Sequence, residues 1–181
     1  MKKPIKNIII HTSDSPYGNA MLINKWHRDR GWSRIGYSGV ILNGIPTHEM
    51  YKDQEYWSFA DGSFEWGRAF DQDPFVSKIE IGAHARGVNS YSLGICLIGK
   101  HGDFTSKQIL KLLEVLREML LNFGLGPDAV LGHYEVDSGK TCPDINMDDL
   151  RNCLKNQIVW HKIRTGVKDK QIILDKRWSD G

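Results

Sequence analysis

The feature that most constrains this chain is an amphipathic pattern in residues 105–123. Apolar side chains recur there at helical spacing, and Thr105 and Gln108 form a capping box at its start. Gly124 follows at the position where helices commonly end. Because a helix with one apolar face must bury that face, the segment predicts a helix packed on another layer of the fold.

Apolar, β-branched segments supply that second layer. Residues 7–11, 37–42 and 92–98 are predicted to form buried strands. Further elements are predicted over residues 20–30 (helix), 129–131 (strand) and 147–154 (helix). Strands that alternate with helices indicate a single α/β domain, with a central mixed β-sheet flanked by helices.

Composition narrows the classes of function. The 181 residues carry 24 Lys and Arg against 22 Asp and Glu, a formal net charge of +2. A dedicated nucleic-acid binder usually has a clear basic excess, so we expect no nucleic-acid partner. The apolar runs are far shorter than the ~20 residues of a transmembrane helix, and residues 8–10 are too few for a signal-peptide core. We therefore expect synthesis in the cytoplasm without a signal peptide.

Two histidines and a cysteine form the strongest candidate for chemistry. His11 ends the first predicted strand, His133 follows another, and Cys142 comes nine residues later. The three cysteines of the chain make no disulfide framework, so an important cysteine is expected to be a ligand or a nucleophile. Two imidazoles and a thiolate leave a tetrahedral zinc ion one open position, as in catalytic zinc sites. Spacing alone leaves open that each residue is structural, because no CxxC or HExxH pattern is present.

Short motifs over residues 6–154 add a resemblance to a known family. In chain order they are IIIHTS (8–13), WHRDRGW (26–32), DGSFEWGR (61–68), GAHARGVN (82–89), SLGICLIG (92–99), GHYE (132–135) and KTCP (140–143). The chain resembles the zinc-dependent N-acetylmuramoyl-L-alanine amidases of the type-2 family, which includes phage lysozyme-type amidases and peptidoglycan recognition proteins. Cysteine rather than aspartate in the last ligand position is typical of the phage lysozyme-type branch.

The resemblance implies a hydrolase that cleaves the amide bond between N-acetylmuramic acid and L-alanine of peptidoglycan. It implies that Zn²⁺ is bound by His11, His133 and Cys142. Zinc lowers the pKa of its water towards ~7 and so supplies hydroxide at neutral pH. The implied catalytic residues are Tyr37 and Lys140. Lys140 would stabilise the oxyanion, and Tyr37 would orient the water or donate a hydrogen bond to the same oxygen.

Other residues of these motifs receive weaker assignments. We assign His84 and Asn89 to substrate binding, and a role in holding their loop stays open for both. Cys96, among apolar residues of a predicted strand, is expected to be a buried and inert thiol. His27, on the predicted helix over residues 20–30, is expected at the surface.

The predicted amidase domain covers residues 1–154, with a hairpin insertion near residues 43–60. Residues 49–73 carry seven acidic side chains against one Lys and one Arg, and are expected to form strands and loops. The insertion is either surface decoration or an extra wall of a glycan-peptide groove. Residues 155–181 are predicted to be a basic C-terminal extension, with seven Lys and Arg against three Asp.

These observations predict a phage or prophage endolysin. It is expected to be a monomer whose partner is peptidoglycan, and to act on the cell wall after release from the cytoplasm. Two alternatives stay open: a non-catalytic peptidoglycan-binding protein, and a cytoplasmic amidase that recycles anhydro-muramyl peptides. Members of the first group lack the ligand cysteine, and members of the second usually carry aspartate as the third ligand.

Overall fold

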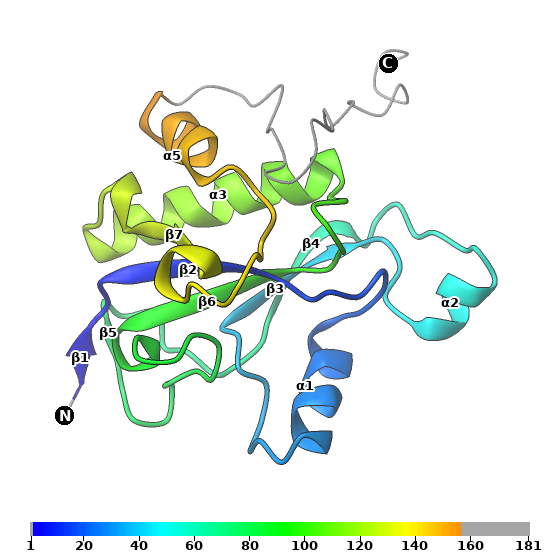
Figure 1. Cartoon of the computed structure of the whole chain (residues 1–181), viewed down its shortest axis with the longest axis horizontal. Helices are drawn as coiled ribbons and strands as arrows, with labels where there is room; N and C mark the ends of the chain where they lie inside the picture. Colours follow the sequence, from blue (N-terminus) through cyan, green and yellow to red (C-terminus); the bar gives the residue numbers. More distant parts are fainter. Residues whose placement is uncertain (1, 157–181) are drawn as a thin grey trace.

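A five-stranded mixed sheet forms the centre of the molecule, and the computed structural model describes residues 2–156 (Figure 1). The sheet has the strand order β4-β3-β6-β2-β7. Its strands are β2 (Asn7–Thr12), β3 (Gly39–Asn43), β4 (Asp61–Trp66), β6 (Ser92–Leu97) and β7 (Val130–Gly132). Strands β3, β6, β2 and β7 run parallel, and only β4 is antiparallel to its neighbour. The predicted single α/β domain with a central mixed sheet is confirmed.

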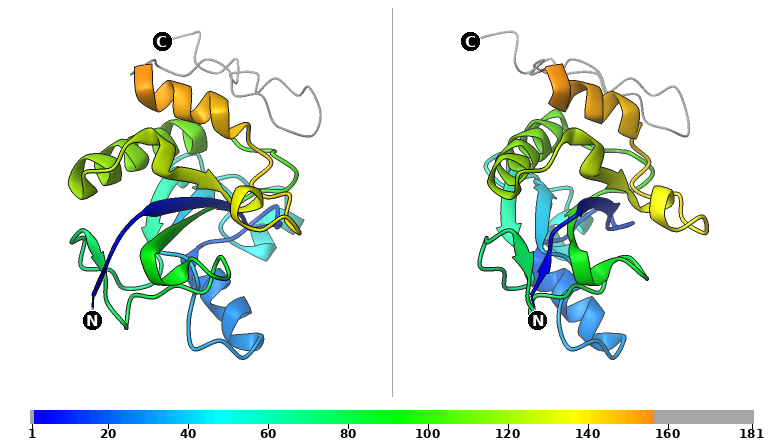
Figure 2. Two further views of the ribbon diagram at one scale, coloured as in Figure 1. Left: turned by 60° about the vertical axis from the view of Figure 1, so that its left-hand side comes forward. Right: turned by 90° about the vertical axis from the view of Figure 1, so that its left-hand side faces the viewer.

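Helices cover both faces of this sheet (Figures 1 and 2). The longer helices are α1 (Ala20–Asp29), α3 (Ser106–Phe123) and α5 (Met147–Asn156), and the short ones are α2 (His48–Lys52), α4 (His133–Val136), η1 (Asn89–Tyr91) and η2 (Pro127–Ala129). Helices α3 and α5 lie on one face, and α1 lies on the other. A small antiparallel pair, β1 (Lys3–Pro4) with β5 (Phe75–Val76), lies outside the main sheet.

The alternation of side chains along the strands divides the core in two. Ile8 and Ile10 of β2 point toward α3 and belong to the larger apolar cluster. Val40 of β3 and Cys96 of β6 belong to a smaller cluster on the α1 face. His11 follows Ile10 and therefore also points to the α1 face, which is where the polar site is built.

Helix α3 has the boundaries that its sequence predicts. The Thr105 hydroxyl oxygen accepts from the Gln108 amide, and the Gln108 side chain accepts from the Thr105 amide, so the capping box is complete. Gly124 ends the helix with φ at 65°, a left-handed conformation that glycine adopts without steric cost. The helix buries its apolar face against the larger cluster.

The segment between β3 and β4 differs from its prediction. Strands and loops are predicted for residues 49–73, but α2 begins at His48 within the segment 43–60. The Thr47 hydroxyl caps this helix by accepting from the Met50 amide, and the Met50 side chain is buried. The sequence prediction is wrong here because a helix of five residues is too short to show a full apolar period.

The C-terminal extension and the absence of transmembrane helices are two further features predicted from the sequence. The predicted basic extension over residues 155–181 lies outside the described residues, apart from Lys155 and Asn156 at the end of α5. Among residues 2–156, no helix combines the length and the apolarity needed to cross a lipid bilayer.

Candidate metal centre and active site

Strand pairing brings the predicted ligands together. Strand β7 runs parallel to β2, with Gly132 opposite Ile10. His11 follows Ile10 on β2, and His133 follows Gly132 as the first residue of α4. The two imidazole rings therefore meet at the carboxyl ends of neighbouring strands, with their centroids 4.5 Å apart.

Cys142 completes this cluster from the loop after α4. Its sulfur lies 3.3 Å from Nδ1 of His133 and 4.0 Å from Nδ1 of His11. The three ligand atoms all lie within 4.8 Å of one another. The Cys142 carbonyl also accepts a hydrogen bond from the Tyr134 amide, so the loop returns against the start of α4. Within residues 2–156, this is the one group of three or more His, Cys, Asp and Glu side chains close enough to hold a metal ion.

An ion pair between helices fixes the position of His133. Glu135 accepts from the Gly132 amide at 2.7 Å, immediately before His133. Arg151 of α5 pairs with Glu135 at 3.0 Å and also donates to the Val130 carbonyl at 3.0 Å. Arg151 thus joins both ends of β7 to α5, and no motif in the sequence points to this role.

Burial keeps the side chains of the three candidate ligands uncharged. It lowers the pKa of His11 well below the usual range, and the neighbouring imidazoles of His84 and His133 lower it further. Burial also lowers the pKa of His133 and raises the pKa of the Cys142 thiol. Neutral imidazole and thiolate are the forms that bind a metal, so metal binding would displace the thiol proton.

Tyr37 lies beside the candidate ligand His11, just before β3. The two ring centroids are 5.0 Å apart, and the phenol lies close to the buried thiol of Cys96. Burial raises the pKa of Tyr37 well above 10, and the two cysteines Cys96 and Cys142 add to the shift. The phenol is therefore an O–H donor at neutral pH.

Lys140 lies two residues before Cys142 on the same loop, and its side chain is exposed. Its amide donates to the Asp137 carbonyl at 3.0 Å, which closes the turn after α4. Its positive charge contributes to the lowered pKa of His133 and opposes the rise in the pKa of Cys142. The structure thus brings this cation within electrostatic range of the ligand cluster.

His84 and Asn89 lie in one loop next to His11. Nδ1 of His84 is 3.0 Å from Nε2 of His11, and burial lowers the pKa of His84 to about 4. The Asn89 side-chain oxygen accepts from the amides of His84 and Ala85, at 3.0 and 2.9 Å. Both residues therefore take part in the structure of the loop.

His27 is buried rather than exposed, which corrects the sequence prediction. It is 5% exposed, and its Nδ1 accepts from the Gly36 amide at 3.0 Å. Its ring also lies 5.4 Å from that of Tyr37. The spacing of four residues between Ile23 and His27, the two buried residues of α1, is the signal that would have revealed this inward position.

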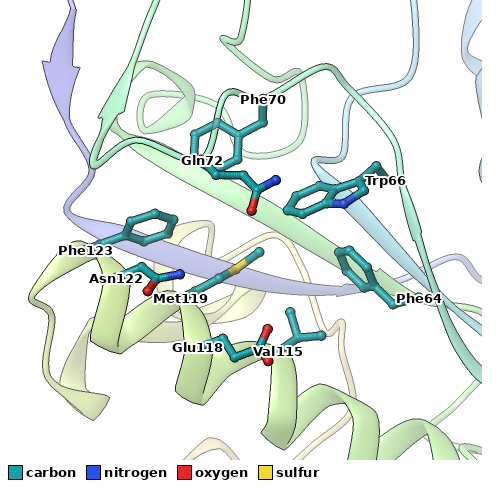
Figure 3. Close-up of a pocket in the computed structure, with 9 residues that line it drawn as sticks. All are labelled: Phe64, Trp66, Phe70, Gln72, Val115, Glu118, Met119, Asn122 and Phe123. Carbon is teal, nitrogen blue, oxygen red and sulfur yellow. The ribbon is translucent and has the colours of Figure 1, made fainter.

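A separate cavity of about 290 Å³ lies on the α3 face of the sheet (Figure 3). Phe64, Trp66 and Phe70 line one side, and Met119 and Phe123 of α3 line the other. Phe64 and Phe70 pack on the larger cluster, whereas Cys96 and Tyr37 belong with the smaller one. The sheet therefore separates this aromatic cavity from the candidate metal centre.

Comparisons with known proteins agree with this geometry. Residues 1–145 match a protein family described as N-acetylmuramoyl-L-alanine amidase. The chain is 32% identical over 133 residues to an endolysin of Enterobacteria phage K11, covering 69% of each protein.

Two solved structures extend the similarity to the fold. The N-acetylmuramoyl-L-alanine amidase LysC from Clostridium intestinale has a TM-score of 0.64 at 22% identity, covering 84% of this chain and 87% of that one. A mutant of Drosophila PGRP-LB in complex with tracheal cytotoxin has a TM-score of 0.56 at 25% identity, with coverages of 78% and 76%.

Proposed function

This chain belongs to the N-acetylmuramoyl-L-alanine amidase family, and we propose that it is a zinc-dependent hydrolase that cleaves the amide bond between N-acetylmuramic acid and L-alanine of peptidoglycan. The observation that carries the proposal is the convergence of His11, His133 and Cys142 at the carboxyl ends of paired strands. The family match spans all three residues.

The donor set fits zinc. Bond lengths of about 2.0–2.1 Å to nitrogen and 2.3 Å to sulfur at tetrahedral angles imply nitrogen–sulfur separations of about 3.5 Å. The distances from the Cys142 sulfur, 3.3 Å to His133 and 4.0 Å to His11, lie on either side of that value. Two imidazoles and one thiolate are ligands that zinc prefers, and three protein ligands leave a position open. His11, His133 and Cys142 would hold the zinc ion, which would supply the Lewis acidity and the acidified water that amide hydrolysis requires.

Two other side chains would act on the charge that develops during cleavage. As the amide carbonyl is attacked, negative charge gathers on its oxygen, and fixed donors next to that oxygen lower the barrier. The Tyr37 phenol keeps its proton and can donate to this oxygen. Lys140 adds a positive charge near the ligand cluster, and its exposed position leaves it free to approach a bound substrate.

Similarity to phage endolysins supports peptidoglycan as the substrate and the cell wall as the place of action. The likeness to a phage endolysin supports a lytic role, in which the protein acts on the cell wall after release from the cytoplasm. Exposed aromatic side chains of the insertion, Tyr51, Trp57 and Phe59, offer surfaces on which sugar rings can stack. Substrate contact by His84 and Asn89 stays a prediction.

Purified protein incubated with peptidoglycan tests this function. With zinc present, new amino-terminal L-alanine is expected to appear. A chelator should stop its release, and added zinc should restore it. His133→Asn should abolish the activity, whereas the matched change His48→Asn, at an exposed residue of α2, should preserve it. No new L-alanine termini from fully zinc-loaded protein would refute the hydrolase and favour a peptidoglycan-binding protein.

A further inference from the structure

His84, which is not one of the three proposed metal ligands, contacts the proposed ligand His11 on the side of the ring away from Cys142. Nδ1 of His11 faces the Cys142 sulfur, and its other nitrogen, Nε2, lies 3.0 Å from Nδ1 of His84. His84 is 8% exposed, so water does not compete for this contact. Both nitrogens of His11 are therefore directed, one toward the other ligands and one toward His84.

A chain of hydrogen bonds fixes which nitrogen carries each proton. The Ser92 hydroxyl donates to the Val88 carbonyl at 2.9 Å, so its oxygen is an acceptor for Nε2 of His84, 3.4 Å away. A neutral imidazole with its hydrogen on Nε2 has a lone pair on Nδ1. That lone pair accepts from Nε2–H of His11, which leaves the lone pair of His11 Nδ1 facing the Cys142 sulfur. These protons are assigned from the hydrogen-bond network.

The loop and the sheet leave the His84 ring little freedom. The Asn89 side chain holds the His84 amide at 3.0 Å. Gly94 of β6 lies directly under the ring, where an added Cβ would be 2.7 Å from Cγ of His84. Gly82 is also close, since a Cβ there would approach Cδ2 of His84 to 2.6 Å. The ring is therefore held in one orientation by close contacts as well as by hydrogen bonds.

We propose that His84 is a positioning residue that sets the tautomer and the ring orientation of His11, so that His11 presents Nδ1 for metal binding. The inference rests on the proposed zinc function. A ligand that is oriented in advance binds metal more tightly, and loss of such a supporting partner typically weakens metal affinity about 10–100-fold. Direct contact of His84 with substrate would instead raise KM and leave the affinity for zinc unchanged.

A pair of near-isosteric variants separates hydrogen bonding from shape. His84→Asn keeps an acceptor oxygen close to the position of Nδ1, whereas His84→Leu removes the acceptor and keeps a similar volume. We expect His84→Leu to weaken zinc binding about 10–100-fold, measured by competition with a chromophoric chelator. His84→Asn should bind zinc several-fold more tightly than His84→Leu. The visible spectrum of the cobalt(II)-loaded protein should change in His84→Leu and be restored toward wild type in His84→Asn.

Controls distinguish the possible outcomes. His48→Leu removes an exposed histidine of α2 that is outside the cluster of candidate ligands, and this variant should bind zinc like the wild type. Equal zinc affinity in wild type and His84→Leu, or equal losses in both His84 variants, would overturn the proposal. If His84→Leu does not fold, Ser92→Ala decides, since reduced zinc affinity supports the proposal and unchanged affinity overturns it. A wild-type protein that binds no zinc would instead refute the metal centre itself.

Discussion

Gln108 is a buried polar side chain whose replacement should have a large and calculable effect. It is 0% exposed at the start of α3. Its side-chain nitrogen donates to the carbonyls of Ile41 and Ile98, at 3.1 and 2.9 Å, and its oxygen accepts from the Thr105 amide at 3.0 Å. The two bonds that the nitrogen donates fasten α3 to β3 and to the residue after β6, and so to the sheet that carries the candidate ligands.

Gln108→Met keeps the length of the side chain and removes all three hydrogen bonds. A net contribution of about 1 kcal/mol for each bond predicts a loss of about 3 kcal/mol in the free energy of unfolding. The buried Ile98 carbonyl would also lose the Gln108 donor, which pushes the loss upward, whereas the Ile41 carbonyl still accepts from the Ile98 amide at 2.9 Å. Out of a total stability of about 5–15 kcal/mol, this is a large fraction.

Urea unfolding of the metal-free protein, followed by circular dichroism, measures the effect. Glu114→Met is the matched control, because it places the same side chain at an exposed position of the same helix. We expect the control to lie within about 0.5 kcal/mol of wild type. A loss below about 1 kcal/mol for Gln108→Met, with an unchanged denaturant slope, would refute the reasoning that these three bonds fasten the helix.

Three further predictions concern the site. Tyr37→Phe removes the phenol donor and should lower kcat about 10²–10³-fold while zinc affinity stays unchanged, as kinetics and chelator competition would show. Lys140→Met should also lower kcat without loss of zinc, and Lys140→Arg should recover part of the rate; wild-type rates in Lys140→Met would exclude the role. The pKa of His27 is lowered to about 4 by burial, so the folded state resists protonation. The contribution of neutral His27 to stability is therefore complete above pH 6.5 and is lost as the pH falls toward 4. The difference between the two pKa values corresponds to about 3 kcal/mol, which wild type should lose relative to His27→Gln over that range in urea titrations.

The elements that sequence predicts best are those whose signals are local. Helix α3 is predicted closely because its cap, its apolar face and its terminal glycine all lie within residues 105–124. Helix α2 is missed because its five residues, of which only Met50 is buried, are too few to show a full apolar period. His27 is misplaced for a related reason, since the depth of a helical residue depends on what packs against it.

In the candidate site, too, local motifs predict the identity of the residues, whereas the fold determines which of them meet. The identities of His11, His133 and Cys142 come from motifs, but their meeting depends on the pairing of β2 with β7. The contact between His11 and His84 joins residues 73 apart and depends on the fold of a loop, so no local pattern could predict it. The large separation of these residues in the sequence therefore hides how close their side chains lie in the fold.

The most direct test of the account compares two cysteine variants in metal content and product release. Cys142→Ala should lose both bound zinc and the release of amino-terminal L-alanine from peptidoglycan. Cys153→Ala, which changes a cysteine packed against the larger cluster from α5, should keep both. Zinc-dependent release of L-alanine by Cys142→Ala, with zinc bound as in the wild type, would contradict the central claim that this cysteine completes the metal centre.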